Sequence, residues 1–171
     1  EALESDYLKN QIEGHILNIN PKVKLEKGHY SIGDLTGDDI PELVLFIERN
    51  PLDVNDQGLL EVYGFNELNH YLIDSIPMNY DNTNYILKTG FVSMNKQGIL
   101  LSNQVGSQAG VTYCYILENN KLRSILNPKK VNLVSVTANN SIEDVNGDGV
   151  LDFSIYRSEE HTSELQSRHN L

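Results

Sequence analysis

Two short stretches of the chain place oxygen-bearing side chains at alternate positions around a tight turn. They are DLTGDDIPE, which begins at Asp34, and DVNGDGVLD, which begins at Asp144. Calcium takes about six to eight oxygen ligands, and a loop can supply them from alternate side chains, one backbone carbonyl and a later carboxylate. The predicted ligands are Asp34, Thr36, Asp38, the Ile40 carbonyl and Glu42 in the first loop, and Asp144, Asn146, Asp148, the Val150 carbonyl and Asp152 in the second.

The two predicted sites differ in strength and in the residue at the sharp turn. Gly149 occupies the turn position of the second loop, where a positive φ is favoured. Asp39 occupies it in the first loop, and Asp adopts the left-handed conformation more readily than most residues. The first site is expected to be weaker, because Thr36 replaces the Asp or Asn expected there. A second interpretation needs no metal: both stretches would be Asx-rich hairpin turns held by side-chain to backbone hydrogen bonds.

The residues that follow the loops exclude an EF-hand. An EF-hand requires a bidentate Glu at the twelfth loop position and a helix on each side. Leu45 holds that position in the first loop, and Ser154 or Ile155 holds it in the second. Both loops lead into strand-like sequence, which also excludes a dockerin-type loop. The loops are therefore expected to join strands.

One helix and many short strands are predicted around these loops. Apolar residues recur at helical spacing over residues 1–18, which predicts an amphipathic helix that ends before Pro21. After Gly28, β-branched and aromatic segments alternate with turn residues. The predicted strands are His29–Ile32, Glu42–Glu48, Leu59–Asn66, His70–Ile76, Asn84–Thr89, Gln97–Asn103, Val111–Leu117, Leu122–Leu126, Asn132–Thr137 and Leu151–Tyr156.

The chain also contains an internal repeat. Residues 33–48 and 143–156 align without gaps over fourteen positions, with their first aspartates 110 residues apart. Residues 60–77 and 111–128 resemble each other at an offset of about 51 residues. The offsets indicate a period of about 55 residues, which is typical of a blade of about four strands.

This period divides the chain into units. A helix and linker at 1–27 precede three units at about 28–80, 81–130 and 131–156. The middle copy of the acidic loop would fall at 90–98, where the acids are missing. The sequence predicts a mainly β fold, a partial β-propeller of about two and a half four-stranded blades with a short N-terminal helix.

The stretches DLTGDDIPELVLF and DVNGDGVLDFSIY resemble the FG-GAP/VCBS-type repeat of bacterial proteins with integrin-alpha-like β-propellers. The resemblance covers most of residues 28–156, although the usual Phe-Gly and Gly-Ala-Pro signatures are absent. It implies a structural role for calcium. It also implies a location that is extracellular or at the cell surface, often secreted or as a lipid-anchored lipoprotein.

Charge, apolar runs and the few cysteine and histidine residues exclude several classes of function. The 24 acidic residues outnumber the 13 basic ones, for a net charge of -11, which disfavours a nucleic-acid partner. No apolar run approaches the length of a membrane span. Cys114, the single cysteine, is expected to be a buried, inert thiol. His15, His29 and His70 are scattered in the sequence, so no catalytic zinc is expected.

Residues 157–171 are predicted to be a non-native tail. The stretch RSEEHTSELQS resembles the translation of a common sequencing-adapter oligonucleotide. His161 and His169 are therefore left out of any predicted site. The native chain is expected to continue beyond Tyr156. Because Glu1 is not Met, an N-terminal segment is expected either to have been removed or to lie outside this sequence.

These observations predict a calcium-stabilised extracellular β-propeller module for surface interaction or ligand binding, with protein or carbohydrate as partner and without catalysis. The alternative is the scaffold part of a secreted hydrolase or lyase whose active site lies in sequence outside this chain.

Overall fold

The computed structural model describes residues 2–23, 29–50, 52–53, 55–66, 69–78, 85–105, 109–125, 134–135, 142–144 and 146–153. Within these ranges the chain forms one helix, α1 (Ala2–Ile19), followed only by β-strands. The strands are β1 (Tyr30–Gly33), β2 (Glu42–Ile47), β3 (Gly58–Asn66), β4 (Asn69–Met78), β5 (Tyr85–Ser93), β6 (Lys96–Val105), β7 (Ala109–Glu118), β8 (Lys121–Ser124), β9 (Val134–Ser135), β10 (Ile142–Glu143) and β11 (Asp152–Phe153). The mainly β prediction is confirmed, and each predicted strand overlaps an observed one. Only β10 was not predicted.

The strands form antiparallel sheets whose order follows the sequence. The first sheet has the order β1-β2-β3-β4, and the second has the order β5-β6-β7-β8 with β9 also paired to β7. Strands β10 and β11 form a separate two-stranded hairpin. The described strands close into neither a barrel nor a propeller, so the propeller architecture stays a prediction. The predicted linker residues 24–28 and the predicted tail at 157–171 lie outside the described residues.

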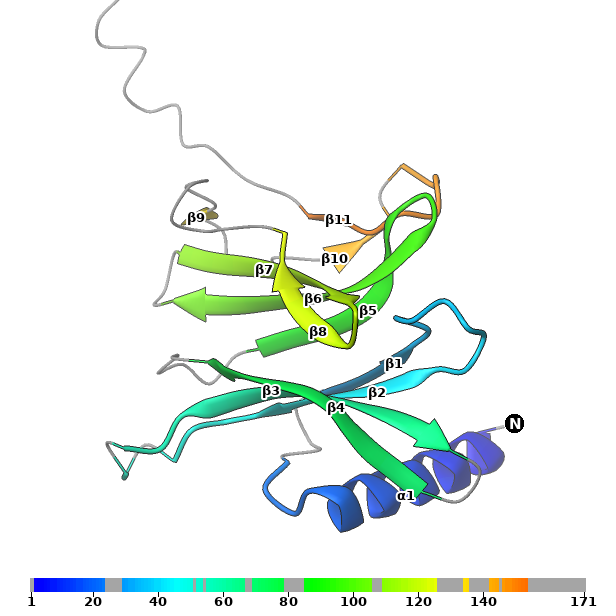
Figure 1. The fold of residues 1–171 in the computed structure, drawn as a ribbon, viewed down its shortest axis with the longest axis vertical. Helices are drawn as coiled ribbons and strands as arrows, with labels where there is room; N and C mark the ends of the chain where they lie inside the picture. The colour runs from blue at the N-terminus through cyan, green and yellow to red at the C-terminus, as the bar shows by residue number, and fades with distance from the viewer. Residues whose placement is uncertain are drawn as a thin grey trace, which may run out of the picture.

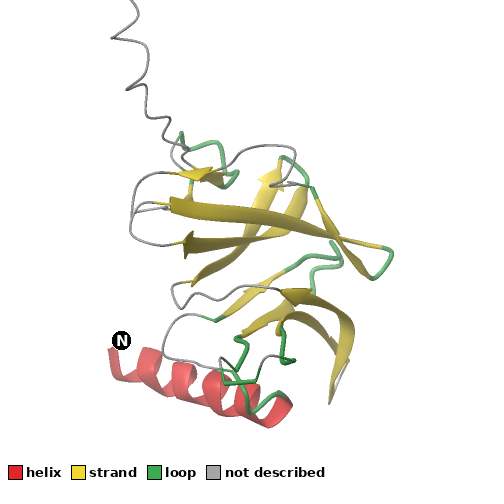
Figure 2. Ribbon diagram, turned by 90° about the vertical axis from the view of Figure 1, so that its left-hand side faces the viewer, coloured by secondary structure: helices red, strands yellow, loops and turns green. Residues whose placement is uncertain are grey.

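These elements are stacked as layers. Helix α1 covers one face of the first sheet, the second sheet lies over the opposite face, and the β10–β11 hairpin lies beyond the second sheet (Figure 1). The view from the side shows the same order (Figure 2). Because a strand has side chains on both faces, each sheet contributes to two apolar layers.

The largest core lies between the two sheets. It gathers alternate residues of the central strands, which is the period-two pattern of a paired strand. Its buried members are Leu35, Val44, Phe46, Leu60, Val62, Met78, Leu87, Ile99, Leu101, Tyr115 and Leu117. Burial of one large apolar side chain contributes about 1.5–3 kcal/mol, so this layer is the main source of stability.

The two outer layers use the remaining residues of the same strands. Ile16 and Val23 pack with Leu43, Leu45 and Ile47 beneath the first sheet. On the far side of the second sheet, Leu100 and Cys114 are buried together, with Val92 and Leu151 packed against them. Strand β2 contributes to both faces and is buried at all six residues, which explains its continuous apolar run LVLFI.

Polar contacts join the first strands of the two sheets. The hydroxyls of Ser31 and Thr89 lie 2.8 Å apart, and the Thr89 hydroxyl donates to the carbonyl of Ile32 at 2.7 Å. A Cβ added to Gly33 would lie 2.8 Å from Thr89, so only glycine permits this approach. The third layer is joined to β5 in a similar way, because the Leu151 amide donates to the Phe91 carbonyl at 2.7 Å.

Candidate functional site

The first acidic loop connects β1 to β2 and is held by the carboxylates at its two ends. Asp34 accepts hydrogen bonds from the amides of Gly37, Asp38 and Asp39 at 2.7, 3.1 and 3.2 Å. Glu42, which is 4% exposed, accepts from the amides of Leu35 and Thr36 and from the Thr36 hydroxyl, at 2.7, 3.2 and 3.1 Å. The loop is thus closed by its own side chains, with Asp34 at the start and Glu42 at the end.

The second acidic loop connects β10 to β11, and its first aspartate makes the same contacts as Asp34. Asp144 accepts from the amides of Gly147 and Asp148 at 2.7 and 3.1 Å, and from the amide of Gly149 at 2.8 Å. Further on, an aspartate accepts from the amide two residues later in both loops: Asp38 from Ile40 at 2.9 Å and Asp148 from Val150 at 2.8 Å.

The backbone also matches between the loops. The predicted turn positions both have a positive φ, 66° at Asp39 and 83° at Gly149, which confirms that prediction. A second positive φ occurs two residues earlier, 84° at Gly37 and 77° at Gly147, and the sequence analysis did not identify it. The amide hydrogen bonds of the first and middle aspartates and the same left-handed positions therefore recur in two loops 110 residues apart.

The hydrogen bonds of the first loop change the pKa of Asp34. Burial alone would raise the pKa of Asp34, but the amides of Gly37, Asp39 and Asp38 and the Thr36 hydroxyl outweigh it and lower the pKa below its ordinary value. The anionic form of Asp34 is therefore the form that stabilises the loop.

The donor types of both loops suit calcium, which prefers carboxylate, amide and carbonyl oxygen. A carboxylate has about four lone-pair positions, so one that accepts amide hydrogen bonds can still bind a cation. Among the described residues, however, no three acidic, histidine or cysteine side chains gather into a group that could hold a metal ion. The hydrogen bonds of the Asx-turn interpretation are present in both loops, and calcium binding stays a prediction.

The middle unit has a short turn at the place where the repeat predicts a loop. Strand β5 continues to Ser93 and β6 begins at Lys96, so only Met94 and Asn95 lie between them. This two-residue turn accounts for the missing acids at 90–98, since there is no loop for them to close.

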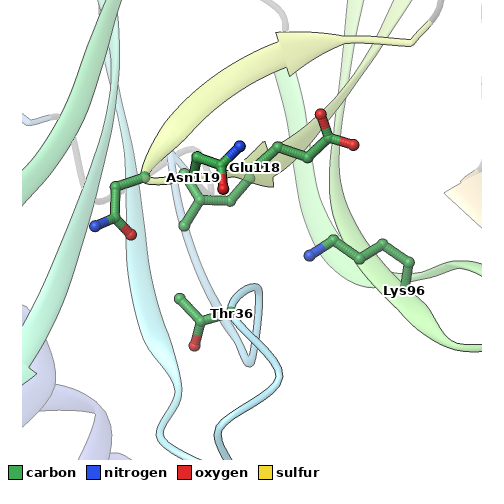
Figure 3. Close-up of a pocket in the computed structure, with 6 residues that line it drawn as sticks. Thr36, Lys96, Glu118 and Asn119 are labelled. Carbon is green, nitrogen blue, oxygen red and sulfur yellow. The ribbon is translucent and has the colours of Figure 1, made fainter.

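A polar cavity of about 530 Å³ lies beside the first acidic loop. Three turns contribute to it: the acidic loop, the turn between β5 and β6, and the turn between β7 and β8, as the labelled side chains in Figure 3 show. The lining residues are Thr36, Lys96, Leu117, Glu118, Asn119 and Asn120. The ammonium of Lys96 donates to the Leu35 carbonyl at 3.1 Å, which fixes one wall of the cavity to the loop. Hydroxyl, amide and charged groups thus surround a space large enough for a small polar ligand.

The folded chain pairs two histidines that appear scattered in the sequence. His15 Nε2 of α1 and His70 Nδ1 of β4 lie 2.8 Å apart. Burial first, and then the nearby His15, lower the pKa of His70 below its ordinary value. This pair was not predictable from the sequence, because 55 residues separate the two histidines and no motif links them. The third histidine, His29, is fully buried, with Nε2 3.4 Å from Glu48 Oε1.

Two further predictions concern Cys114 and membrane spans. The Cys114 side chain is 3% exposed, and burial raises the pKa of its thiol to about 12, as expected for an inert thiol. No helix in the described ranges is long and apolar enough to cross a membrane.

Comparison of the chain with protein-family models, with curated proteins and with solved structures gave no match.

Proposed function

We propose that this chain is a calcium-stabilised, propeller-type β module that acts extracellularly or at the cell surface in interaction or ligand binding, without catalysis. The observation that carries the proposal is the recurrence of one loop structure. Loops that begin at Asp34 and Asp144 share the amide hydrogen bonds of their aspartates and their positive φ angles, and each connects two paired antiparallel strands. Loops of this kind, with oxygen donors at alternate positions, suit a structural calcium ion in each of the two.

The layered sheets support the propeller part of the proposal. The meander β1–β4 lies within residues 28–80 and the meander β5–β8 within residues 81–130. The β10–β11 hairpin lies within residues 131–156, as does β9, which pairs with β7 of the second sheet. Successive layers also meet at β5, where Thr89 contacts Ser31 of β1 and where the Phe91 carbonyl accepts from the amide of Leu151, the residue before β11. Repeat folds bury their apolar faces by such stacking of neighbours.

The polar cavity beside the first loop supports the ligand-binding part. Its walls come from loop ends in two sheets, with Thr36 on one side and Asn119 on the other. Calcium at the adjacent loop would hold Thr36 in place, which links the metal to the shape of the cavity. Binding partners with hydroxyl or amide groups, such as carbohydrate or peptide, fit this lining.

The test is the effect of calcium on thermal stability of the full chain. The melting temperature of each variant is measured with excess chelator and with millimolar calcium, and only the difference between the two is compared. A free calcium concentration of ten times Kd raises the free energy of unfolding by about 1.4 kcal/mol, which raises the melting temperature by roughly 3–6 °C in a chain of this size. The double variant Asp144→Ala with Asp148→Ala is expected to lose most of this rise, because the loop that begins at Asp34 is the weaker of the two proposed sites.

The matched control is Asp53→Ala. Asp53 also accepts an amide hydrogen bond two residues on, from Asn55 at 2.9 Å, but lies outside both acidic loops. This variant should keep the calcium-dependent rise of the unmodified chain. A wild-type chain that melts at the same temperature with and without calcium would contradict the proposal.

A further inference from the structure

His15 and His70 meet in a setting that differs from the acidic loops. Their facing nitrogens are 2.8 Å apart, and their ring centroids are 4.4 Å apart. Both line a cavity of about 280 Å³ whose other walls are apolar. The remaining lining residues are Ile12, Ile16, Ile32, Ile40, Pro41, Leu43 and Phe65. The pair is thus the polar element of an otherwise apolar site.

The backbone on each side of the pair is fixed. Ile16, the neighbour of His15, is 1% exposed and packs in the core beneath the first sheet. His70 is paired in register with Phe65 across β3 and β4, and the Phe65 ring centroid lies 5.1 Å from that of His70. Two imidazoles held by a packed helix and a paired strand need little ordering to bind a shared ligand.

We propose that His15 and His70 form a two-histidine site for a first-row transition cation of the Cu(II) or Ni(II) type. Two nitrogens about 2.0 Å from a metal and at a right angle to each other lie about 2.8 Å apart, the spacing of adjacent ligands in tetragonal copper or nickel. A tetrahedral zinc ion would need the nitrogens about 3.3 Å apart. Water completes the coordination from the open side of the cavity.

Binding requires a tautomer change but no net proton release. One of the two facing nitrogens carries the proton of the present hydrogen bond. That proton moves through solvent to the other nitrogen of the same ring, so both facing nitrogens offer a lone pair to the cation. The imidazole site selects against calcium and magnesium, which prefer oxygen ligands. Calcium should therefore not compete for it, although Ile40 and Pro41 of the first acidic loop line the same cavity.

The test is a calorimetric titration of the full chain with Ni²⁺, and with Cu²⁺ in a second series. One Ni²⁺ per chain is expected to bind, and excess Ca²⁺ should not displace it. Loss of even an outer-shell partner typically costs about 10–100-fold in metal affinity, so His15→Gln and His70→Gln should each weaken binding by about tenfold or more.

The tail histidines provide the matched control. The double variant His161→Gln with His169→Gln removes the same number of imidazoles as the two tested substitutions together and should change the affinity by less than about twofold. Circular dichroism checks that each variant is folded. Paramagnetic broadening by Cu²⁺ in the unmodified chain gives a second readout and should centre on α1 and the β3–β4 hairpin. Full Ni²⁺ affinity in both single variants, loss confined to the tail variant, or no binding by the wild type would overturn the proposal.

Discussion

Asp34 shows how one charge stabilises a loop. Its pKa is lowered because the anion accepts three amide hydrogen bonds that the neutral acid accepts less well. A group whose folded pKa lies below its unfolded value, about 3.9 for Asp, stabilises the fold above that value. This stability is lost as the pH falls through the folded pKa.

The variant Asp34→Asn should therefore be less stable than the wild type at neutral pH. The difference in free energy of unfolding should stay constant above about pH 5 and shrink toward zero as the pH falls below 4, because protonated Asp34 resembles Asn. Urea unfolding from pH 7 to pH 2 measures it. As a control, Asp53→Asn alters a single amide contact outside the acidic loops and should give a smaller, flatter difference. A pH-independent difference for Asp34→Asn would contradict the argument.

Single residues also show where sequence-based prediction succeeds and fails. The left-handed turn at Asp39 and Gly149 was predicted, because alternate acids around a Gly or Asp restrict the local backbone to few conformations. The contact between His15 and His70 was not, because it depends on how α1 lies across the first sheet. The local conformational preference of either histidine does not determine how the helix packs on the sheet.

Between elements, Asp74 connects the two sheets at their outer strands. This β4 carboxylate, 10% exposed, accepts from the Lys121 ammonium at 2.9 Å and from the Leu122 amide of β8 at 2.7 Å. Burial alone would raise the pKa of Asp74, but the Leu122 amide and Lys121 outweigh it and lower the pKa. Asp74 is therefore a fixed contact between layers.

The amide contact should matter more than the ion pair. Asp74→Ala leaves the partly buried Leu122 amide without this acceptor, at a cost of about 1–3 kcal/mol in the free energy of unfolding. Lys121→Ala removes only a side chain that is 72% exposed, and should cost no more than about 1 kcal/mol. Chemical denaturation of both variants measures the costs. Equal costs would show that the charge pair, and not the amide, carries the contact.

Strand positions were predictable, because turn residues separate the β-branched runs and each strand except β9 pairs with a neighbour in sequence. Strand β10 was missed, since two residues are too few to give a periodic pattern. It was harder to predict which element packs against each face of a sheet. The continuous apolar run of β2 indicates burial on both sides, but it does not identify α1 on one side and the second sheet on the other.

In the whole molecule, α1 closes one end of the stack of layers. Ile16 is 1% exposed beneath the first sheet, whereas its neighbour Leu17 is 40% exposed. The face that α1 covers contains Leu43, Leu45 and Ile47, which would otherwise form an apolar surface. Loss of the helix contact should therefore affect association as well as stability.

Ile16→Glu should detach the helix, because it places a charge in an apolar layer. The expected cost is about 3 kcal/mol or more, with increased binding of an apolar dye and a shift to larger species in size-exclusion chromatography. The neighbouring substitution Leu17→Glu adds the same charge on an exposed position and should change stability by no more than about 0.5 kcal/mol. Similar behaviour of the two variants would mean that α1 does not cover this face in solution.

The reactivity of Cys114 reports on the separation of the β10–β11 hairpin from the second sheet. Alkylation requires a thiolate, and the buried thiol, with its pKa raised to about 12, rarely forms one while it packs with Leu100 and beside Leu151. Reagent should reach the sulfur only when the β10–β11 layer separates from the second sheet or the chain unfolds. Because the chain has no other cysteine, the labelling rate measures how often that opening occurs without any substitution being made.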